Sequence, residues 1–354
     1  MKILIKKITF TLFLMVGLNI STSIAKNNND IIVGSVIAAT GQKTTGFIEI
    51  APMNDKGTRI PITIINGAKA GPTLSLIGGT HGYEYAPVMA LQHVAQTIDP
   101  KDLNGNIIIV HVANMPSFLG RTIYYSPADN QNLNRMYPGK ADGSLSQRIA
   151  YAITATVIKQ ADYLIDMHSG DGNEALRPYI YMPHTGKPAF DATIKAMAVS
   201  FGLDHIIIDN TEITEPSKST FTDMTALTFG IPAMTTEVGA AGSTSPKWVD
   251  LNVNGVMNTL KHLKMISGKM LSTKPIVWLG KYEVVKSPET GIFKPSVSMG
   301  YVVAKGGKLG ELVDFFGNHT SYIYAPFAGI VNYVIVTPPI TKGEPLAMIS
   351  EIKK

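Results

Sequence analysis

A histidine and a glutamate three positions apart, His81 and Glu84, follow directly on an apolar segment that ends at Gly78. The sequence Gly-Thr-His-Gly-Tyr-Glu supplies glycines, which let the backbone turn sharply and bring both side chains to one point. An imidazole nitrogen and a carboxylate oxygen both bind Zn²⁺ at about 2.0–2.2 Å. The spacing therefore predicts two ligands of one metal ion at the end of a strand.

Two further residues of the same chemistry stand at the ends of other apolar segments. His168 closes the sequence Tyr-Leu-Ile-Asp-Met-His, and Glu237 closes Ala-Met-Thr-Thr-Glu; glycine follows each within two residues. Ligands bind at the carboxyl ends of strands in an open α/β sheet, so we expect these side chains near His81 and Glu84. His168 is the candidate third ligand. Glu237 is the candidate base, because a glutamate at the tip of an apolar strand is costly unless it is paired or catalytic.

The chain contains no cysteine. This excludes cysteine nucleophiles, thiolate zinc sites and iron–sulfur clusters, so any metal must be held by His, Asp and Glu. Three protein ligands leave one position of Zn²⁺ open for water, which is the arrangement of a hydrolytic centre.

The remaining histidines lack a partner at ligand spacing. His93 falls on the apolar face of a predicted helix and His111 lies inside a predicted strand, so both are expected to pack in the core. No second metal site is predicted from the others, which are His184, His205, His262 and His319.

These residues are set in a chain of alternating strands and helices. Residues 31–70 are rich in Gly, Thr and Ile and are expected to form short β-structure. The alternation that follows is typical of an α/β sheet covered by helices on both faces. Predicted strands cover 73–78, 106–113, 163–167, 179–182, 205–208 and 232–238, and predicted helices cover 86–98, 144–160, 188–201, 220–229 and 249–266.

Helical periodicity ends near residue 267, and β-branched residues and glycines dominate from residue 275 onward. This segment contains a repeat: the Gly-Ile pairs at Gly291 and Gly329 are followed by Lys-Gly-x-x-Leu at Lys305 and by Lys-Gly-x-x-Leu at Lys342. Two matched halves predict a quasi-twofold β-sandwich or barrel. It resembles the barrel-sandwich hammerhead of biotinyl and lipoyl domains, but without their Met-Lys-Met tip, and we expect a structural or lid role.

The first 25 residues resemble a secretory signal. Lys2, Lys6 and Lys7 form a basic start, an apolar stretch of thirteen residues follows, and Ser-Ile-Ala ends at Ala25. The stretch is short for a membrane span, so we expect export with cleavage after Ala25 to the periplasm or medium, and no stable membrane anchor. Without these lysines the formal charge falls from +5 to +2, which gives no case for nucleic-acid binding. The expected division is a signal peptide at 1–25, a catalytic domain at 26–270 and a β domain at 271–354.

The four motifs Gly-Thr-His-Gly-Tyr-Glu, Asn-Leu-Asn-Arg at 132–135, Asp-Met-His-Ser-Gly and Thr-Glu-Val-Gly occur in an order that resembles the succinylglutamate desuccinylase/aspartoacylase family. That family belongs with the zinc carboxypeptidases, and it carries a C-terminal β domain. The resemblance implies a mixed sheet flanked by helices and a zinc-dependent amide hydrolase. The motifs cover roughly residues 70–240, and the β-rich tail extends the resemblance over nearly all of the mature chain.

The resemblance also implies roles for single residues. His81, Glu84 and His168 match the zinc ligands, and Glu237 matches the general base. Asn134 and Arg135 match the pair that holds a substrate carboxylate, for which a guanidinium offers a two-pronged donor. Arg121 resembles the arginine that stabilises the developing oxyanion. These three site residues are implied by the family pattern and not by their spacing.

The chain departs from the family pattern at two places. Asn132 stands where relatives often have an aspartate that accepts a hydrogen bond from the first zinc histidine, and it can accept that bond without adding charge. Asp166 shares a strand face with His168 and either compensates for this loss or only caps the strand end. Leu227 and its neighbours supply no cation where aspartoacylases carry an arginine, which argues against a diacid substrate.

Two catalytic functions fit these residues. The favoured one is an exported zinc-dependent deacylase that cleaves an N-acyl amino acid or a similar small amide. The alternative is a metallocarboxypeptidase acting on cell-wall or nutrient peptides, which the exported location would suit. If the β domain lies over the metal cleft as a lid, it restricts the substrate to small molecules and favours the deacylase. The intact set of four metal-site residues argues against a non-catalytic binding protein, and the sequence leaves the oligomeric state open.

Overall fold

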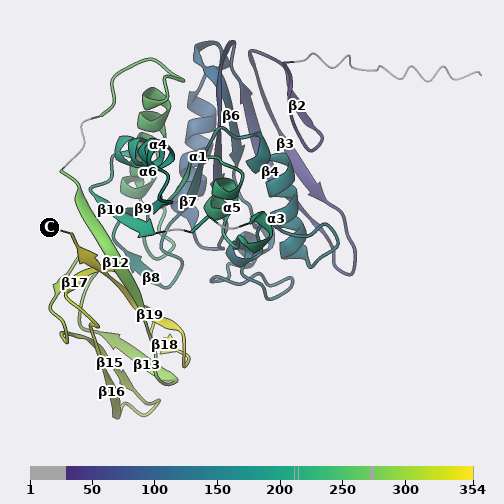
Figure 1. Cartoon of the computed structure of the whole chain (residues 1–354). Coiled ribbons are helices and arrows are strands. Elements are labelled where there is room, and N and C mark those ends of the chain that lie inside the picture. The colour runs from purple at the N-terminus through teal and green to yellow at the C-terminus, as the bar shows by residue number, and fades with distance from the viewer. Residues whose placement is uncertain (1–28, 211, 214, 272–274, 354) are drawn as a thin grey trace, which may run out of the picture.

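A computed structural model of the chain describes residues 29–210, 212–213, 215–271 and 275–353. Its main feature is a 13-stranded sheet with helices packed on it (Figure 1). The strands of the larger body lie in the order β3 (Gln42–Ile50), β4 (Thr58–Asn66), β6 (Asn104–Val110), β5 (Lys69–Gly78), β7 (Tyr163–His168), β11 (Ala233–Glu237), β9 (Tyr179–His184) and β10 (His205–Asn210). A separate hairpin, β1 (Ile31–Val33) with β2 (Val36–Ala38), packs beside β3 and β4.

The centre of the sheet is parallel, and its flanks are mixed. Strands β6, β5, β7 and β11 run in the same direction, whereas β9 is antiparallel to β11 and parallel to β10. Isoleucine, leucine and valine make up most of the buried residues of β6 and β5 taken together, and β7 and β11 are also buried along most of their length, as expected for strands covered on both faces. The predicted mixed sheet flanked by helices is confirmed.

Each of the five predicted helices is present, and one short helix, Met115–Gly120, was not predicted. Ser144 caps α3, and its hydroxyl and the Gln147 side chain exchange hydrogen bonds with each other's backbone. The last long helix begins at Pro246 and not at 249, because a proline suits the first helical position. The helices are α1 (Tyr85–Thr97), α2 (Met115–Gly120), α3 (Leu145–Thr156), α4 (Pro188–Phe201), α5 (Thr222–Thr228) and α6 (Pro246–His262), with single 3₁₀ turns at Pro100–Asp102, Leu133–Arg135, Ile158–Gln160 and Pro216–Lys218.

The two faces of the sheet are covered by different helices. On one face, a side chain at Gly78 would meet Leu91 of α1, and α1, α6 and α4 pack side by side there. On the other face, Thr235 of β11 donates a hydrogen bond to Asp223 of α5 at 2.8 Å. Successive side chains of a strand point to opposite faces of the sheet. Every second residue of β11, counted from Thr235, therefore lies on the face that α5 covers.

The strands after residue 275 extend the main sheet and form a second sheet, as the smaller lobe of Figure 1 shows. β12 (Val277–Lys286) pairs with β10 and continues outward to β19 (Pro345–Ile352), β17 (Gly329–Ile335) and β14 (Val302–Val303), and β8 (Glu174–Leu176) of the larger body pairs with β17. The second sheet has the order β16 (His319–Tyr324), β15 (Lys308–Val313), β13 (Gly291–Pro295) and β18 (Pro339–Ile340).

The two sheets of the lobe obey the predicted repeat. Exchanging β12 with β16, β13 with β17, β14 with β18 and β15 with β19 converts one strand order into the other. Phe293 and Leu312 of one half and Val331 and Leu346 of the other share one buried cluster. The all-β character of this segment is confirmed, while its likeness to biotinyl and lipoyl hammerheads stays a prediction.

The expected signal segment 1–25 lies outside the described residues. Among the residues that are described, no helix has both the length and the apolar character needed to cross a membrane. The boundary predicted near residue 270 falls between α6 and β12, although β12 is hydrogen-bonded to β10 of the larger body.

Candidate metal centre

Three neighbouring parallel strands end at the same edge of the sheet. β5 ends at Gly78, β7 at His168 and β11 at Glu237, with β7 between the other two. His168 and Glu237 lie opposite each other in the register of β7 and β11. The expectation that these strand ends meet is therefore confirmed.

The turn after β5 brings His81 and Glu84 back over the strand ends. Gly79 has a φ of +67°, a conformation that L side chains rarely adopt, so glycine is required at this point. Gly82 lies so close to the carbonyl oxygens of Ser117 and Thr122 that a β-carbon would clash with them. Glu84 is the residue that precedes α1, and its carboxylate turns to His81 instead of capping the helix.

His81, Glu84 and His168 form the group that could hold a metal ion. One donor atom from each residue lies within 4.8 Å of the others. Glu84 Oε1 is 2.7 Å from His81 Nδ1, and Glu84 Oε2 is 3.0 Å from His168 Nδ1. Glu84 and His168 are almost fully buried, so only a partner inside the protein can balance their polar atoms.

The outer nitrogen of each imidazole has its own acceptor. Asn132 Oδ1 lies 3.2 Å from His81 Nε2, and Asp166 Oδ2 lies 3.1 Å from His168 Nε2. These acceptors favour the tautomers with a proton on Nε2, which leaves both Nδ1 lone pairs directed at the Glu84 carboxylate. Two imidazole nitrogens and a carboxylate that face one another in this way form a donor set that fits a divalent metal ion.

The charges of the cluster support the same conclusion. Burial alone would raise the pKa of Glu84, but the charges of His168 and His81 lower the pKa to about 2. Burial lowers the pKa of His168, and the carboxylates of Glu84 and Asp166 outweigh this and leave the pKa well above its ordinary value. The site thus offers an ionised carboxylate, and it stabilises positive charge at the position of His168.

Glu237, at the end of the neighbouring strand β11, lines one cavity together with His81, Glu84 and His168. Burial raises the pKa of its carboxyl well above the usual range; the charge of His168 opposes this, and the charge of Glu84 adds to it. A carboxylate with a raised pKa next to a metal group is suited to accept and return a proton.

The 3₁₀ turn Leu133–Arg135 carries the predicted carboxylate-binding pair. Asn134 Nδ2 lies 3.5 Å from His168 Nε2, and the Asn134 Oδ1 atom is buried without a hydrogen-bond partner. The Arg135 guanidinium lies 4.5 Å over the ring of Phe221. Both residues line the cavity of the metal group.

Arg121 is not brought into this group. It follows α2 in a left-handed conformation with φ of +50°, its side chain is exposed, and it is not among the residues that line the cavity. Its proposed contact with the oxyanion stays a prediction.

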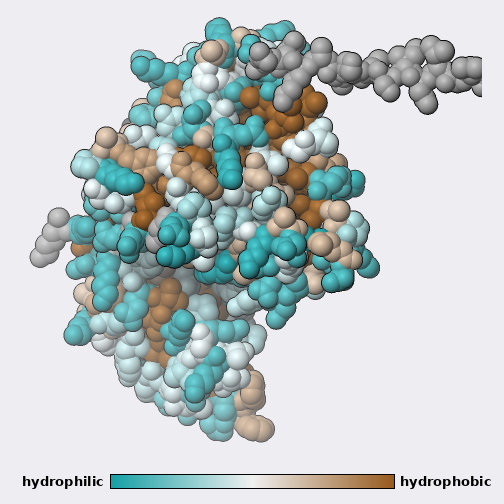
Figure 2. Space-filling view, turned by 45° about the vertical axis from the view of Figure 1, so that its right-hand side comes forward, coloured by the Kyte–Doolittle hydropathy of each residue, from teal (hydrophilic) through white to brown (hydrophobic). Residues whose placement is uncertain are grey.

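The metal group opens into a cavity of about 730 Å³. One wall comes from the smaller lobe, and Figure 2 shows the surface indented where that lobe meets the larger body. The smaller lobe therefore contributes one wall of the cavity, and its role as a lid stays a prediction. The lobe residues in the wall are Tyr282, Val284, Lys286, Tyr333, Lys342, Gly343, Glu344, Pro345 and Met348.

Glu174 and Tyr124 also line the cavity, although neither belongs to a motif that the sequence marks as functional. The Tyr124 hydroxyl donates to Glu174 Oε1 at 2.7 Å, and the Tyr124 ring meets the edge of His81 at a centroid distance of 6.0 Å. Burial raises the pKa of Glu174 to about 7. The only signal for Glu174 was its position just after the His168 motif, because β8 has three residues and shows no periodicity.

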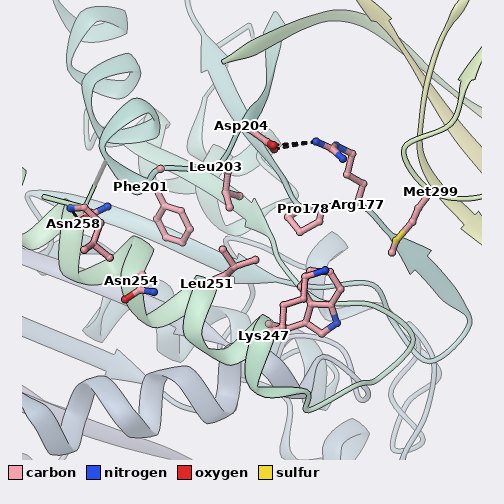
Figure 3. Close-up of a pocket in the computed structure, with 13 residues that line it drawn as sticks. Arg177, Pro178, Phe201, Leu203, Asp204, Lys247, Leu251, Asn254, Asn258 and Met299 are labelled. Atoms are coloured by element: carbon pink, nitrogen blue, oxygen red, sulfur yellow. Dashed lines mark hydrogen bonds and ion pairs between the residues drawn. The ribbon is translucent and has the colours of Figure 1, made fainter. Parts of the chain in front are cut away.

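A second cavity, of about 410 Å³, lies near the ends of α4 and α6. Figure 3 shows Phe201, Leu203 and Leu251 pointing into it, with Arg177 paired to Asp204 at its edge. The residues that line it include no histidine, and they form no group able to hold a metal.

Comparison with known proteins identifies the catalytic region. A family model for the succinylglutamate desuccinylase/aspartoacylase catalytic domain matches residues 70–263. The chain is 26% identical to the N-alpha-acetyl-L-2,4-diaminobutyric acid deacetylase of Halomonas elongata over 318 residues, which cover 87% of this chain and 91% of that protein.

Solved structures agree with this assignment. A succinylglutamate desuccinylase/aspartoacylase from Rhodobacter sphaeroides superposes with a TM-score of 0.78 at 27% identity, covering 89% of this chain and 98% of that one. The product-bound ectoine utilization protein EutE (DoeB) from Ruegeria pomeroyi gives a TM-score of 0.79 at 26% identity, covering 92% and 99%. The chain therefore belongs to the succinylglutamate desuccinylase/aspartoacylase family.

Proposed function

We propose that the protein is a zinc-dependent deacylase that hydrolyses the amide bond of a small N-acyl amino acid. The observation that carries this proposal is the convergence of His81, Glu84 and His168 beside Glu237 in one partly closed cavity. Named relatives act on amide bonds of acylated amino acids, as the deacetylase of Halomonas elongata does. Two imidazoles and one carboxylate are a donor set found in hydrolytic zinc sites.

The chain's own residues account for the proton transfers. A bound Zn²⁺ would polarise the amide carbonyl and acidify a water molecule. Glu237 accepts a proton from the attacking water and returns it to the leaving amine, as a general base and then a general acid. Asn132 and Asp166 hold the imidazoles in the tautomers that face Glu84. Arg121 is proposed to approach the oxyanion, which from its present position requires movement of the segment after α2.

Asn134 and Arg135 are proposed to hold the substrate carboxylate. Arg135→Ala is expected to raise KM for substrates with a free carboxylate by about 10–100-fold, because a hydrogen bond to a charged group contributes about 1.5–3 kcal/mol. Steady-state kinetics on free and C-amidated forms of one N-acyl amino acid measure this. The matched control is Arg59→Ala, since Arg59 also lies over a phenylalanine ring, Phe47 at 4.3 Å, outside the cavity. Equal cleavage of both forms by the parent protein would contradict the anchoring role.

Substrate length separates the deacylase from the carboxypeptidase. We expect kcat/KM to be highest for an N-acetyl amino acid and to fall steadily through di-, tri- and tetrapeptides, because the smaller lobe closes one side of the cavity. The measurement is kcat/KM across this series for the metal-loaded protein. A steady rise with length would instead support the metallocarboxypeptidase.

The proposed site of action is the periplasm or the medium. The basic start, apolar stretch and small residues before Ala25 support export with cleavage at that point. N-terminal sequencing of the exported protein is expected to begin at Lys26. A mature chain that still begins at Met1 would contradict export by this signal.

A further inference from the structure

Helix α5 lines the active-site cavity with an acidic and an apolar side chain. Asp223 and Leu227 are four residues apart and therefore lie on the same face of the helix, and both line the cavity together with Met224. A diacid substrate would need a cation on this wall. The helix offers a carboxylate and a hydrocarbon surface instead.

The position of Asp223 relative to the metal group follows from the sheet register. Its Oδ2 atom accepts a hydrogen bond from the Thr235 hydroxyl at 2.8 Å. Thr235 lies two residues before Glu237 on the same face of β11, and it pairs with Asp166, which lies two residues before His168. Two residues of a strand span about 6.6 Å. A side chain of two or three methylenes on the reacting amino acid, together with the hydrogen bond that its terminal ammonium donates, covers that distance.

The surroundings of Asp223 suit a positively charged group. The Asp223 carboxylate receives hydrogen bonds from Thr235 and from the backbone N–H of Met224, but none of the ion pairs among the described residues includes it. The rings of Tyr181 and Tyr282 also line the cavity, with centroids 5.6 Å apart. Carboxylates and tyrosine rings together are a common environment for an ammonium group.

The charge of Asp223 is available at neutral pH. Burial, followed by the nearby charge of Asp166, raises the pKa of its carboxyl to about 6. The carboxyl is therefore mostly ionised at pH 7, and an ammonium group beside it would lower the pKa further.

We propose that Asp223 is a specificity-determining residue that selects N-acyl amino acids whose short side chain ends in an ammonium group. The inference rests on the proposed deacylase function, since it names the substrate class of the same cavity. Leu227 contributes the apolar surface along which the methylenes of the side chain lie.

The test compares cationic amino acids with neutral ones of the same shape. Calorimetric Kd values are measured on the full mature protein for L-2,4-diaminobutyrate against L-norvaline, and for L-ornithine against L-norleucine. We expect the cationic member of at least one pair to bind about 10–100-fold more tightly to the parent protein, and Asp223→Asn to remove most of this preference. Asp250→Asn, an exposed aspartate of α6, is the matched control and is expected to keep the preference.

The ratio of the two Kd values also shows whether Asp223 selects cationic side chains or has only a structural role. Asparagine retains the acceptor for Thr235, so a purely structural Asp223 would leave the ratio of the two Kd values unchanged. A ratio near one in the parent protein, or an unchanged ratio in Asp223→Asn, overturns the inference. Turnover of the acetylated forms is measured separately. Absence of turnover with an intact binding ratio would contradict the proposed function and leave this inference standing.

Discussion

Glu237→Gln is expected to lower kcat by about 10²–10⁴-fold while the protein keeps its metal and changes little in KM. Glutamine preserves the size and hydrogen-bonding shape of the side chain but cannot accept a proton from water. Glu237 lies opposite His168, so the substitution removes the proposed base beside the metal ligands. The three ligand residues themselves are unchanged. The measurements are kcat, KM and bound metal for the parent and variant proteins on one N-acyl amino acid.

The control for this substitution is Glu311→Gln, which makes the same chemical change at a partly exposed glutamate paired with Lys308 in the smaller lobe. Its kcat is expected to match that of the parent protein. Near-normal turnover in Glu237→Gln would show that another carboxyl is the base. Glu174 would then be the first residue to examine, because it lines the same cavity and burial raises its pKa to about 7.

The pH dependence of Glu237 has a defined sign. Burial raises the pKa of its carboxyl, so the deprotonated form that serves as base is lost as pH falls through this raised value. The acidic limb of kcat/KM in the parent protein is therefore expected above the ordinary pKa of glutamate, and a bound divalent cation draws it back toward that value. The residual activity of Glu237→Gln is expected to lack this fall in kcat/KM at acidic pH.

Most strands and helices of the larger body could be predicted from the sequence, because their signals are local. Apolar runs defined β5, β7 and β11, and parallel strands that are neighbours in a sheet must end at a common edge. Once these strands were assigned, the meeting of His168 and Glu237 followed from the topology. The repeat after residue 275 was equally visible, because each half repeats the same glycine and lysine positions.

The walls of the cavity could not be predicted in the same way. Tyr282 and Tyr333 reach the metal cleft only because β12 joins the main sheet beside β10, and β17 pairs with β8. Those pairings join segments that are distant in the sequence and share no motif. The prediction that His93 packs in the core is wrong: it is exposed, because it lies just beyond the buried face formed by Leu91 and Val94.

His168→Ala and His81→Ala are each expected to abolish stoichiometric metal binding and, with it, nearly all activity. The parent protein is expected to carry about one zinc ion per chain, because three ligands and one open position make a complete hydrolytic site. Each histidine supplies one of three donors in a site without thiolates, so removal leaves two ligands and a large loss of affinity. Metal analysis of the purified proteins after dialysis measures the occupancy.

His184→Ala is the matched control, since His184 ends strand β9 as His168 ends β7, but it is exposed and pairs with Asp191 outside the metal group. It is expected to retain full occupancy. The folding of His168→Ala is checked by its thermal transition, because Asp166 and Glu84 would lose the buried imidazole between them. Full metal occupancy in both His81→Ala and His168→Ala would overturn the assignment. Loss in only one of them would show that the other histidine is not a ligand, since a site that depends on three donors must respond to the removal of either imidazole.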